Sequence, residues 1–131
     1  MPEENVEIVR GAIAALNERD VDGYLGLCAP DVELITPVAA IEGPSVGAQG
    51  IRQFFAGVDE AMTEFHLDVK ELRALDGQRV LAVGQVRSVS KGGFASTLPF
   101  VNVYEIKDAK LCRIRVYNDQ DEGLRAAGLS G

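Results

Sequence analysis

The second half of the chain alternates between apolar and polar residues with a period of two, and no other feature constrains the fold as strongly. We expect strands over residues 65–75, 79–90, 94–106 and 111–118. The connections between them are short and carry turn residues: Asp76-Gly77, Lys91-Gly92-Gly93 and Lys107-Asp108-Ala109. Gly84, inside the second of these strands, predicts a bulge or bend that curves the sheet. The strands therefore predict a curved antiparallel sheet.

Helical patterns come before this run of strands. A first helix is marked by one apolar stripe, Val6, Val9, Ile13 and Leu16. We expect a second helix over residues 21–28, capped by Asp20, a short strand over 32–36, and a loop over 39–49. A third amphipathic helix spans residues 51–62, and a short terminal helix follows Asp119 with Leu124 and Leu129 as anchors. Helices followed by antiparallel strands give an α+β fold class.

Length and charge narrow the possible partners. The 131 residues fit a single domain, 1–131, with a sizeable core. A formal net charge of −7 makes nucleic acid and anionic membrane surfaces poor partners, because both reward clustered basic residues. The acidic N-terminal residues carry no apolar signal region, so we expect a cytoplasmic protein. Cys28 and Cys112 are too few for a disulfide framework, and we expect buried thiols.

Four segments carry a family resemblance: AALNERDVDGY, PDVELITPV, GIRQFF and RIRVYNDQDEGLRAAGL. With this order of elements, the chain resembles the SnoaL-like group of the nuclear transport factor 2-like superfamily. The resemblance implies a cone-shaped, cystatin-like fold in which a curved sheet wraps around the N-terminal helices and encloses one central pocket. It also implies a homodimer through the outer face of the sheet. Members include steroid isomerases, polyketide cyclases, epoxide hydrolases and dehydratases.

The steroid isomerase branch is excluded by its chemistry. Such an enzyme uses an aspartate base, with a tyrosine and a protonated aspartate donating to the substrate oxygen. The resemblance assigns these places to Thr36, Ala12 and Val101, none of which can do that work. The losses would remove both the base and the donors that stabilise the transition state. We therefore expect no steroid isomerisation by this mechanism.

The other enzymatic branches need a carboxylate in the pocket. The resemblance places the epoxide hydrolase carboxylate of the last strand near Val116, which is apolar. Arg87 has the parity of the outer face. For a cyclase, the nearest acid or base candidates are Asp119 and Glu33, both at strand ends near the pocket mouth. These two carboxylates remain the catalytic candidates.

Strand alternation predicts which residues face the pocket. On the last strand Cys112, Ile114, Val116 and Asn118 should face the helices, and Arg113, Arg115 and Tyr117 should face outward. We assign Asn102 and Tyr104 to the outer face as well, where aromatic residues would suit a dimer interface. The predicted lining is mostly apolar: Ile13, Leu16, Ile35, Phe55, Val86, Val101, Val103, Ile114 and Val116.

Each polar candidate has two interpretations. Thr36 is either a hydrogen-bond donor to a ligand or a strand-end residue bonded to nearby backbone. Asn118 is a ligand contact or a turn residue, and Asp119 a helix cap or an acid. Tyr24 would reach the pocket mouth, and His66, the single histidine, is a surface residue or half of a pair with Asp68. No spacing of Cys, His and carboxylates suits a metal, and we expect no cofactor.

Three functions remain open. The first is a protein that binds a small, mostly apolar, oxygenated metabolite, which could be polycyclic, with Thr36 and Asn118 as polar contacts. The second is an enzyme of the cyclase, isomerase or dehydratase type that uses a carboxylate at the pocket mouth. The third is a dimeric protein-interaction module that uses the outer sheet face.

Overall fold

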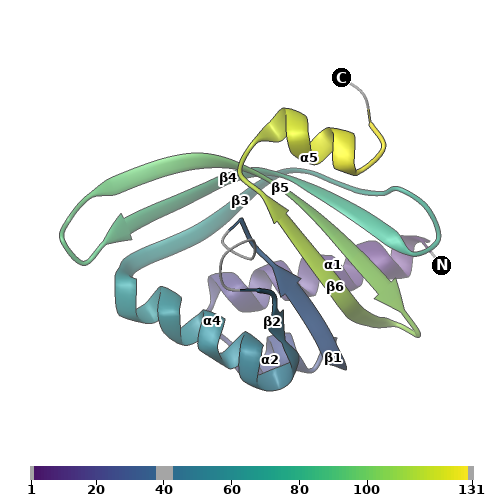
Figure 1. Cartoon of the computed structure of the whole chain (residues 1–131), viewed down its shortest axis with the longest axis horizontal. Coiled ribbons are helices and arrows are strands. Elements are labelled where there is room, and N and C mark those ends of the chain that lie inside the picture. Colours follow the sequence, from purple (N-terminus) through teal and green to yellow (C-terminus); the bar gives the residue numbers. More distant parts are fainter. Residues whose placement is uncertain (1, 38–42, 130–131) are drawn as a thin grey trace.

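The computed structural model of the protein describes residues 2–37 and 43–129. Its elements, labelled as in Figure 1, are α1 (Pro2–Asn17), α2 (Val21–Leu25), β1 (Cys28–Ile35), β2 (Ser45–Val46), α4 (Gly47–Ala61), β3 (Met62–Ala74), β4 (Arg79–Ser90), β5 (Ala95–Lys107), β6 (Lys110–Tyr117) and α5 (Gln120–Ala126). The expected helices and strands are present, with ends that shift by a few residues. The short strand β2 was not expected.

The six strands form one curved sheet in the order β2-β1-β6-β5-β4-β3. All neighbours are antiparallel except β1 and β6, which run parallel. Figure 1 shows α1, α2 and α4 on one side of the sheet and α5 on the other. The expected α+β cone is therefore confirmed, and it has an inner face toward α1, α2 and α4 and an outer face toward α5.

Helix α1 is held against the sheet by its apolar stripe and by two asparagines. Val9, Ile13 and Leu16 are buried in the main core, as their spacing predicts. Near the helix start, Asn5 Nδ2 donates to the carbonyl of Gly77 at 3.0 Å. At the other end, the Asn17 amide makes two hydrogen bonds with the backbone of Leu67. Because β3 is an edge strand, Asn17 satisfies backbone groups that would otherwise be open to pairing with another chain.

The sheet bends sharply where β4 passes β3 at Gly84. The β3–β4 pairing shifts by one residue between Val69 and Glu71, opposite this glycine. A Cβ atom at Gly84 would overlap the carbonyl oxygen of Asp68, so the backbones approach each other too closely for any side chain. The expected bulge or bend at this position is confirmed.

Helix α5 covers part of the outer face. The Asp119 carboxylate caps it by accepting a hydrogen bond from the Glu122 amide at 3.0 Å. The helix and the residues after it pack on a second apolar cluster, which holds Leu81, Val83, Val101, Val103 and Ala127, with Leu124 and Leu129 against it. The predicted terminal helix, its cap and its two anchors are confirmed.

The two cysteines differ from the prediction in their positions. Cys28 starts β1 rather than ending α2, and it is buried, which raises the pKa of its thiol to about 11. Cys112 lies at an irregularity in the β5–β6 pairing, so Leu111 takes the fully buried position and Cys112 is half-buried. The expectation that Cys112 shares the inward set of β6 is therefore wrong. No helix in the described part of the chain is long and apolar enough to cross a membrane.

Candidate functional site

A small cavity of about 70 Å³ lies between the inner face of the sheet and the helices. Its wall draws one or more side chains from each of α1, α2, α4 and β1 and from strands β3 to β6. The lining residues are Leu16, Tyr24, Leu34, Phe54, Phe65, Leu67, Val86, Phe100, Asn102, Tyr104, Ile114 and Val116. Nine of these twelve side chains are hydrocarbon, so the cavity is an apolar space with three polar side chains in its wall.

Asn102 and Tyr104 are the polar centre of this cavity. Both lie on β5 with the same parity, both are at least 95% buried, and Asn102 Nδ2 donates to the Tyr104 hydroxyl oxygen at 3.0 Å. The other amide atom, Asn102 Oδ1, is buried and has no hydrogen-bond partner among the described residues. Rotating the amide by half a turn would only exchange which of its two polar atoms is unpaired.

An unpaired buried amide oxygen is costly. Leaving such a group without a partner costs about 1–3 kcal/mol, and native proteins rarely keep one without a reason. Because Tyr104 already accepts from Asn102, its own O–H hydrogen is free to donate. The pair therefore offers one acceptor and one donor side by side, which suits a ligand hydroxyl that can do both.

The two cavity tyrosines are neutral at ordinary pH. Burial raises the pKa of Tyr104 to about 12, although the hydrogen bond from Asn102 opposes the shift. Burial, together with the nearby Tyr104 and Cys28, raises the pKa of Tyr24 well above its usual range. Phenols of this kind donate hydrogen bonds but do not act as bases near neutral pH.

The predicted parity of β5 is wrong. Asn102 and Tyr104 were assigned to the outer face, but they line the cavity, whereas Val101 and Val103 pack under α5 on the outer face. Both faces of β5 are covered here, so alternation alone could not tell which set faces the helices. The signal that could have decided it was α5, because Leu124 and Leu129 need an apolar surface outside the sheet.

Five of the other predicted pocket residues do line the cavity: Leu16, Tyr24, Val86, Ile114 and Val116. Phe55 is buried but packs edge-on against Tyr24, with ring centroids 5.3 Å apart, and lies behind the cavity wall. Ile35, Thr36 and Asn118 line an open groove of about 470 Å³ where β1 and β6 end, and Thr36 also lines a groove of about 370 Å³ beside α4. Asn118 is exposed, and Thr36 is half-buried at the open end of the cone.

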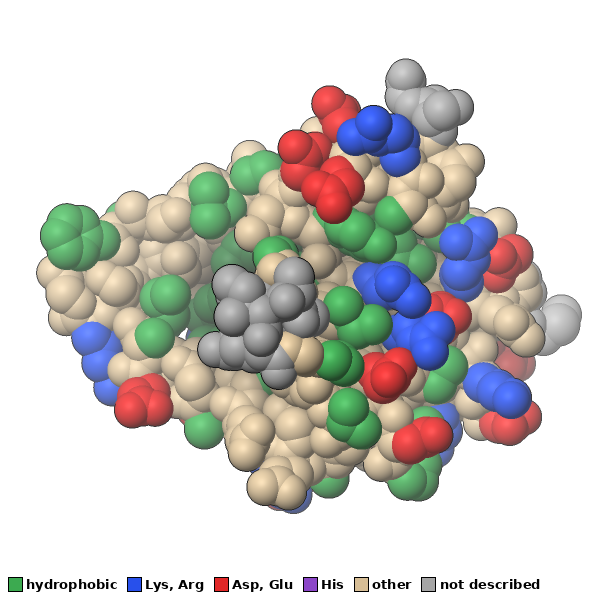
Figure 2. All heavy atoms as spheres, viewed as in Figure 1, with side chains coloured by type: hydrophobic (Ala, Val, Ile, Leu, Met, Phe, Trp, Pro, Cys, Tyr) green, Lys and Arg blue, Asp and Glu red, His purple; other side chains and the backbone are tan. Residues whose placement is uncertain are grey.

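Neither catalytic candidate points into the cavity. Asp119 caps α5. Glu33 lies on β1, where its carboxylate accepts a hydrogen bond from Arg113 Nε at 3.0 Å, and Arg113 also pairs with Glu105. Basic and acidic side chains lie next to one another over β1 and β6 in Figure 2. In the part of the chain that the structure describes, no carboxylate or histidine lines the cavity.

His66 and Asp68 lie on the outer face of β3. Asp68 pairs with Arg87 on β4 through two hydrogen bonds, and His66 Nε2 is 3.5 Å from an oxygen of the same carboxylate. All three side chains are on the surface, so His66 is a surface residue and also lies beside Asp68. Across the described residues, no group of three His, Cys, Asp or Glu side chains is placed to hold a metal ion.

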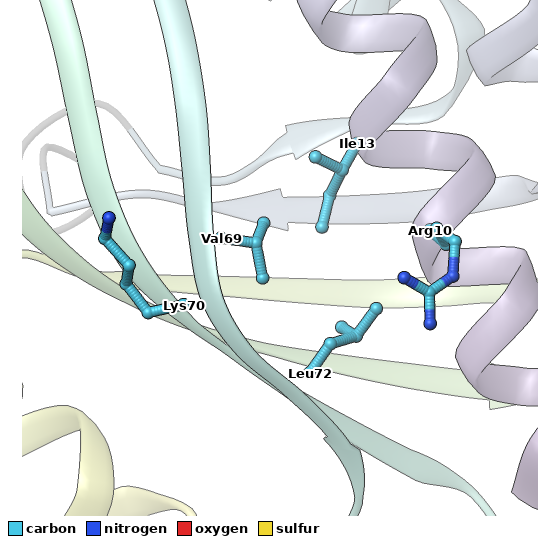
Figure 3. Close-up of a pocket in the computed structure, with 5 residues that line it drawn as sticks. All are labelled: Arg10, Ile13, Val69, Lys70 and Leu72. Carbon is cyan, nitrogen blue, oxygen red and sulfur yellow. The ribbon is translucent and has the colours of Figure 1, made fainter.

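A second groove, of about 310 Å³, lies between α1 and β3. Figure 3 shows Ile13, Val69 and Leu72 converging on it, while Lys70 extends away on the other side of the strand. Arg10 at its rim is exposed and pairs with Glu7. Ile13 thus faces this groove rather than the cavity, and the groove holds no buried polar atom that lacks a partner.

Residues 9–114 match the model of the SnoaL-like domain, which is most of the chain. The chain belongs to the SnoaL-like family. A comparison with curated proteins found no match.

Solved structures agree with the SnoaL-like assignment. A nuclear transport factor 2-like protein of unknown function from Burkholderia pseudomallei K96243 is 26% identical, with 93% of this chain and 95% of that chain covered and a TM-score of 0.80. TerC, co-crystallised with polyporic acid, is 27% identical to this chain. The match covers 95% of this chain and 98% of TerC, with a TM-score of 0.80. A candidate SnoaL-like polyketide cyclase from Jannaschia sp. CCS1 shares the fold, at 15% identity over 100% and 96% of the two chains and a TM-score of 0.79.

Within this SnoaL-like cone, one carried-over position must be corrected. The place of the isomerase's protonated aspartate was assigned to Val101, but Val101 packs against α5 and cannot reach the cavity. Its neighbours on the inner face are Phe100 and Asn102. Ala12 is fully buried in the core, and Thr36 is at the open end, so the three positions bring no acid or base together.

Proposed function

We propose that this SnoaL-like protein binds a small, mostly apolar molecule that carries a hydroxyl group, with Asn102 and Tyr104 as its hydrogen-bonding partners. One observation carries the proposal: Asn102 Oδ1 is buried in the cavity wall without a partner. A ligand hydroxyl would donate to this oxygen and accept from Tyr104. Apolar lining with a few convergent polar groups is typical of small-molecule sites.

A similar protein supports a small molecule as the partner. TerC, at 27% identity and with nearly the whole of both chains covered, was co-crystallised with a small molecule, polyporic acid. The cavity itself is small, but a groove of about 370 Å³ adjoins it at the open end of the cone, so a larger, even polycyclic, ligand body would lie there. Hydrophobic side chains lie at the bottom of the hollow on this side in Figure 2.

Binding is favoured over the cyclase, isomerase or dehydratase alternative. Those reactions need a group that takes or gives a proton near neutral pH. The polar side chains of the cavity are an amide and two phenols, and Asp119 and Glu33 are committed to a helix cap and an ion pair. Nothing among the described residues favours the interaction-module alternative.

The test is calorimetric titration of the protein with 1-octanol, alongside thermal unfolding in its presence. A ligand at about 100 times its dissociation constant adds about 2.7 kcal/mol to the stability of the folded state. The wild type should bind, and the variant with both Asn102→Leu and Tyr104→Phe should bind at least about tenfold more weakly, because two hydrogen bonds are lost. Equal affinities would refute the role of this pair.

A further inference from the structure

Two phenylalanines separate the cavity from the groove at the open end of the cone. Phe54 on α4 and Phe65 on β3 line both spaces, and they are the side chains that the two spaces share. We call this pair the aromatic constriction. Beyond it the groove widens to about 370 Å³ between α4 and the start of β3. A molecule that passes from this groove into the cavity passes Phe54 and Phe65 on its way to Asn102.

The inner cavity is too small for a ring. Its volume is about 70 Å³. An apolar cavity in another protein that holds benzene has about 150 Å³, roughly twice as much. A flexible hydrocarbon chain has a smaller cross-section than a ring, and its hydroxyl end needs space for only a few atoms. The apolar surface continues outward to Leu98, which lies opposite Val86 and is 56% exposed, so a longer apolar body has somewhere to lie.

We propose that the aromatic constriction determines ligand shape, so that the site takes open-chain alcohols and excludes phenols and other ligands whose oxygen is attached directly to a ring. This inference rests on the function proposed above, since it assumes that ligands reach Asn102 and Tyr104. It adds the class of ligand and the residue that selects it, which is Phe54.

Phe65 is the fixed side of the constriction because Arg19 holds it. The Arg19 guanidinium lies 5.3 Å from the centre of the Phe65 ring, and its Nη2 donates to the Phe65 carbonyl at 2.7 Å. Arg19 also donates to the Leu16 carbonyl at 2.6 Å and pairs with Asp59 on α4 at 3.3 Å. One side chain thus ties together the end of α1, β3 and α4.

The backbone of Arg19 supports this assignment. Its φ is +58°, in the left-handed region, where the turn that ends α1 would ordinarily use glycine. The two hydrogen bonds of that turn are present, from Arg19 N to Leu16 O and from Asp20 N to Ala15 O. A conformation unfavourable for arginine is kept at a position where its side chain makes four contacts.

Phe54 is the residue of the aromatic constriction whose substitution would widen it. It is half-buried, and its ring meets Phe55 edge-on with centroids 6.1 Å apart. Truncating Phe54 would join the cavity to the groove without touching Asn102 or Tyr104. Val58 lies on the same helix and lines the groove but not the cavity, so Val58→Ala is the matched control.

The experiment compares an alcohol and a phenol with the same number of carbon atoms and one hydroxyl each, 1-octanol and 4-ethylphenol, by calorimetric titration. The wild type should bind 1-octanol more tightly. In Phe54→Ala the affinity for 4-ethylphenol relative to 1-octanol should rise by about tenfold or more, since the fit of a few carbon atoms is worth that much. Val58→Ala should leave the ratio unchanged. Phe54→Leu serves the same purpose if the alanine variant does not fold.

The outcomes separate this inference from the proposed function. If 1-octanol binding depends on Asn102 and Tyr104 but the ratio is the same in Phe54→Ala, the constriction has no selective role and only this inference fails. A wild type that prefers 4-ethylphenol also overturns it. If the wild type binds neither compound, the proposed function fails, and the inference fails with it.

Discussion

The two faces of the sheet differ in whether their polar side chains have partners within the protein. On the outer face, Arg113 forms ion pairs with Glu33 and with Glu105, and Asp68 pairs with Arg87. On the inner face, Asn102 keeps one buried atom without a partner. These outer groups are therefore satisfied by the protein itself, while among the described residues the inner face holds one buried atom that a partner would have to satisfy. This contrast points to the inner face as the place for a ligand.

The largest expected effect is a loss of folding stability at high pH, caused by the ionisation of Tyr104 on the inner face. The pKa of Tyr104 is raised from about 10 to about 12 in the folded state, which corresponds to about 3 kcal/mol. This stability is fully present below pH 10 and is lost as the pH rises through 12, because the unfolded chain ionises first. Urea unfolding between pH 8 and 12 should show a smaller loss in Tyr104→Phe. Equal losses would mean that Tyr104 titrates as an exposed phenol.

A substitution on the outer face should lower the stability of the fold without changing ligand affinity. In Gly123→Ala the new Cβ would lie 2.5 Å from Val101 Cβ, so α5 must move, at a cost of about 2 kcal/mol. Gly57→Ala is the control: it is a helical glycine with open space around it, and should gain about 1 kcal/mol. Chemical unfolding measures both. A Gly123→Ala protein as stable as the wild type would show that α5 does not pack as described.

A double substitution on the inner face should have the opposite effects: it should raise the stability of the fold and weaken ligand binding. Replacing Asn102 with Leu and Tyr104 with Phe removes the unpaired amide oxygen and the hydrogen bond beside it. The double variant should be more stable by about 1 kcal/mol, because the penalty of the buried unpaired group disappears. Urea unfolding without ligand tests this. A loss of stability would mean that the pair contributes to the fold, and that the unpaired oxygen is not a cost kept for binding.

The smallest effect concerns the outer ion pair. The hydrogen bond from Arg87 holds the pKa of Asp68 below its usual value. The stability that this provides is present above the ordinary carboxyl pKa and is lost as the pH falls through the lowered one. In Arg87→Gln, the NMR titration of the Asp68 carboxyl should move up toward the ordinary value. Arg52→Gln, which affects the exposed pair with Asp22, should leave it in place.

Sequence alone predicted the scaffold because local and global signals agreed there. The stripe of α1, the caps Asp20 and Asp119, and the bend at Gly84 each follow from residue type and spacing. Each is present in the structure with the expected contacts. Two element ends moved near Cys28, because Pro30 suggested the end of a helix but lies within β1.

The centre of the cavity could not be predicted in the same way. Deciding which alternate side chains of a strand face inward needs one apolar set and one polar set. In β5 the inner set contains a polar residue, Asn102, and the outer set contains valines. A buried asparagine looks exposed in a sequence, and the covering helix α5 makes outer valines look buried. The aromatic constriction depends on the angle at which β3 leaves the end of α4, and the residue pattern of neither element sets that angle.

The parallel pairing of β1 with β6 has a consequence for how the chain folds. Glu33 and Arg113 lie side by side although 80 residues separate them. During synthesis β1 leaves the ribosome early, and its main neighbour does not exist until the sheet's other long strands have been made. The edge of β1 that pairs with β6 therefore stays unpaired until β6 has been synthesised. This delay slows folding and leaves β1 open to aggregation. A chain cut before β6 would keep α1 and the β3–β4 hairpin but could not close the cone.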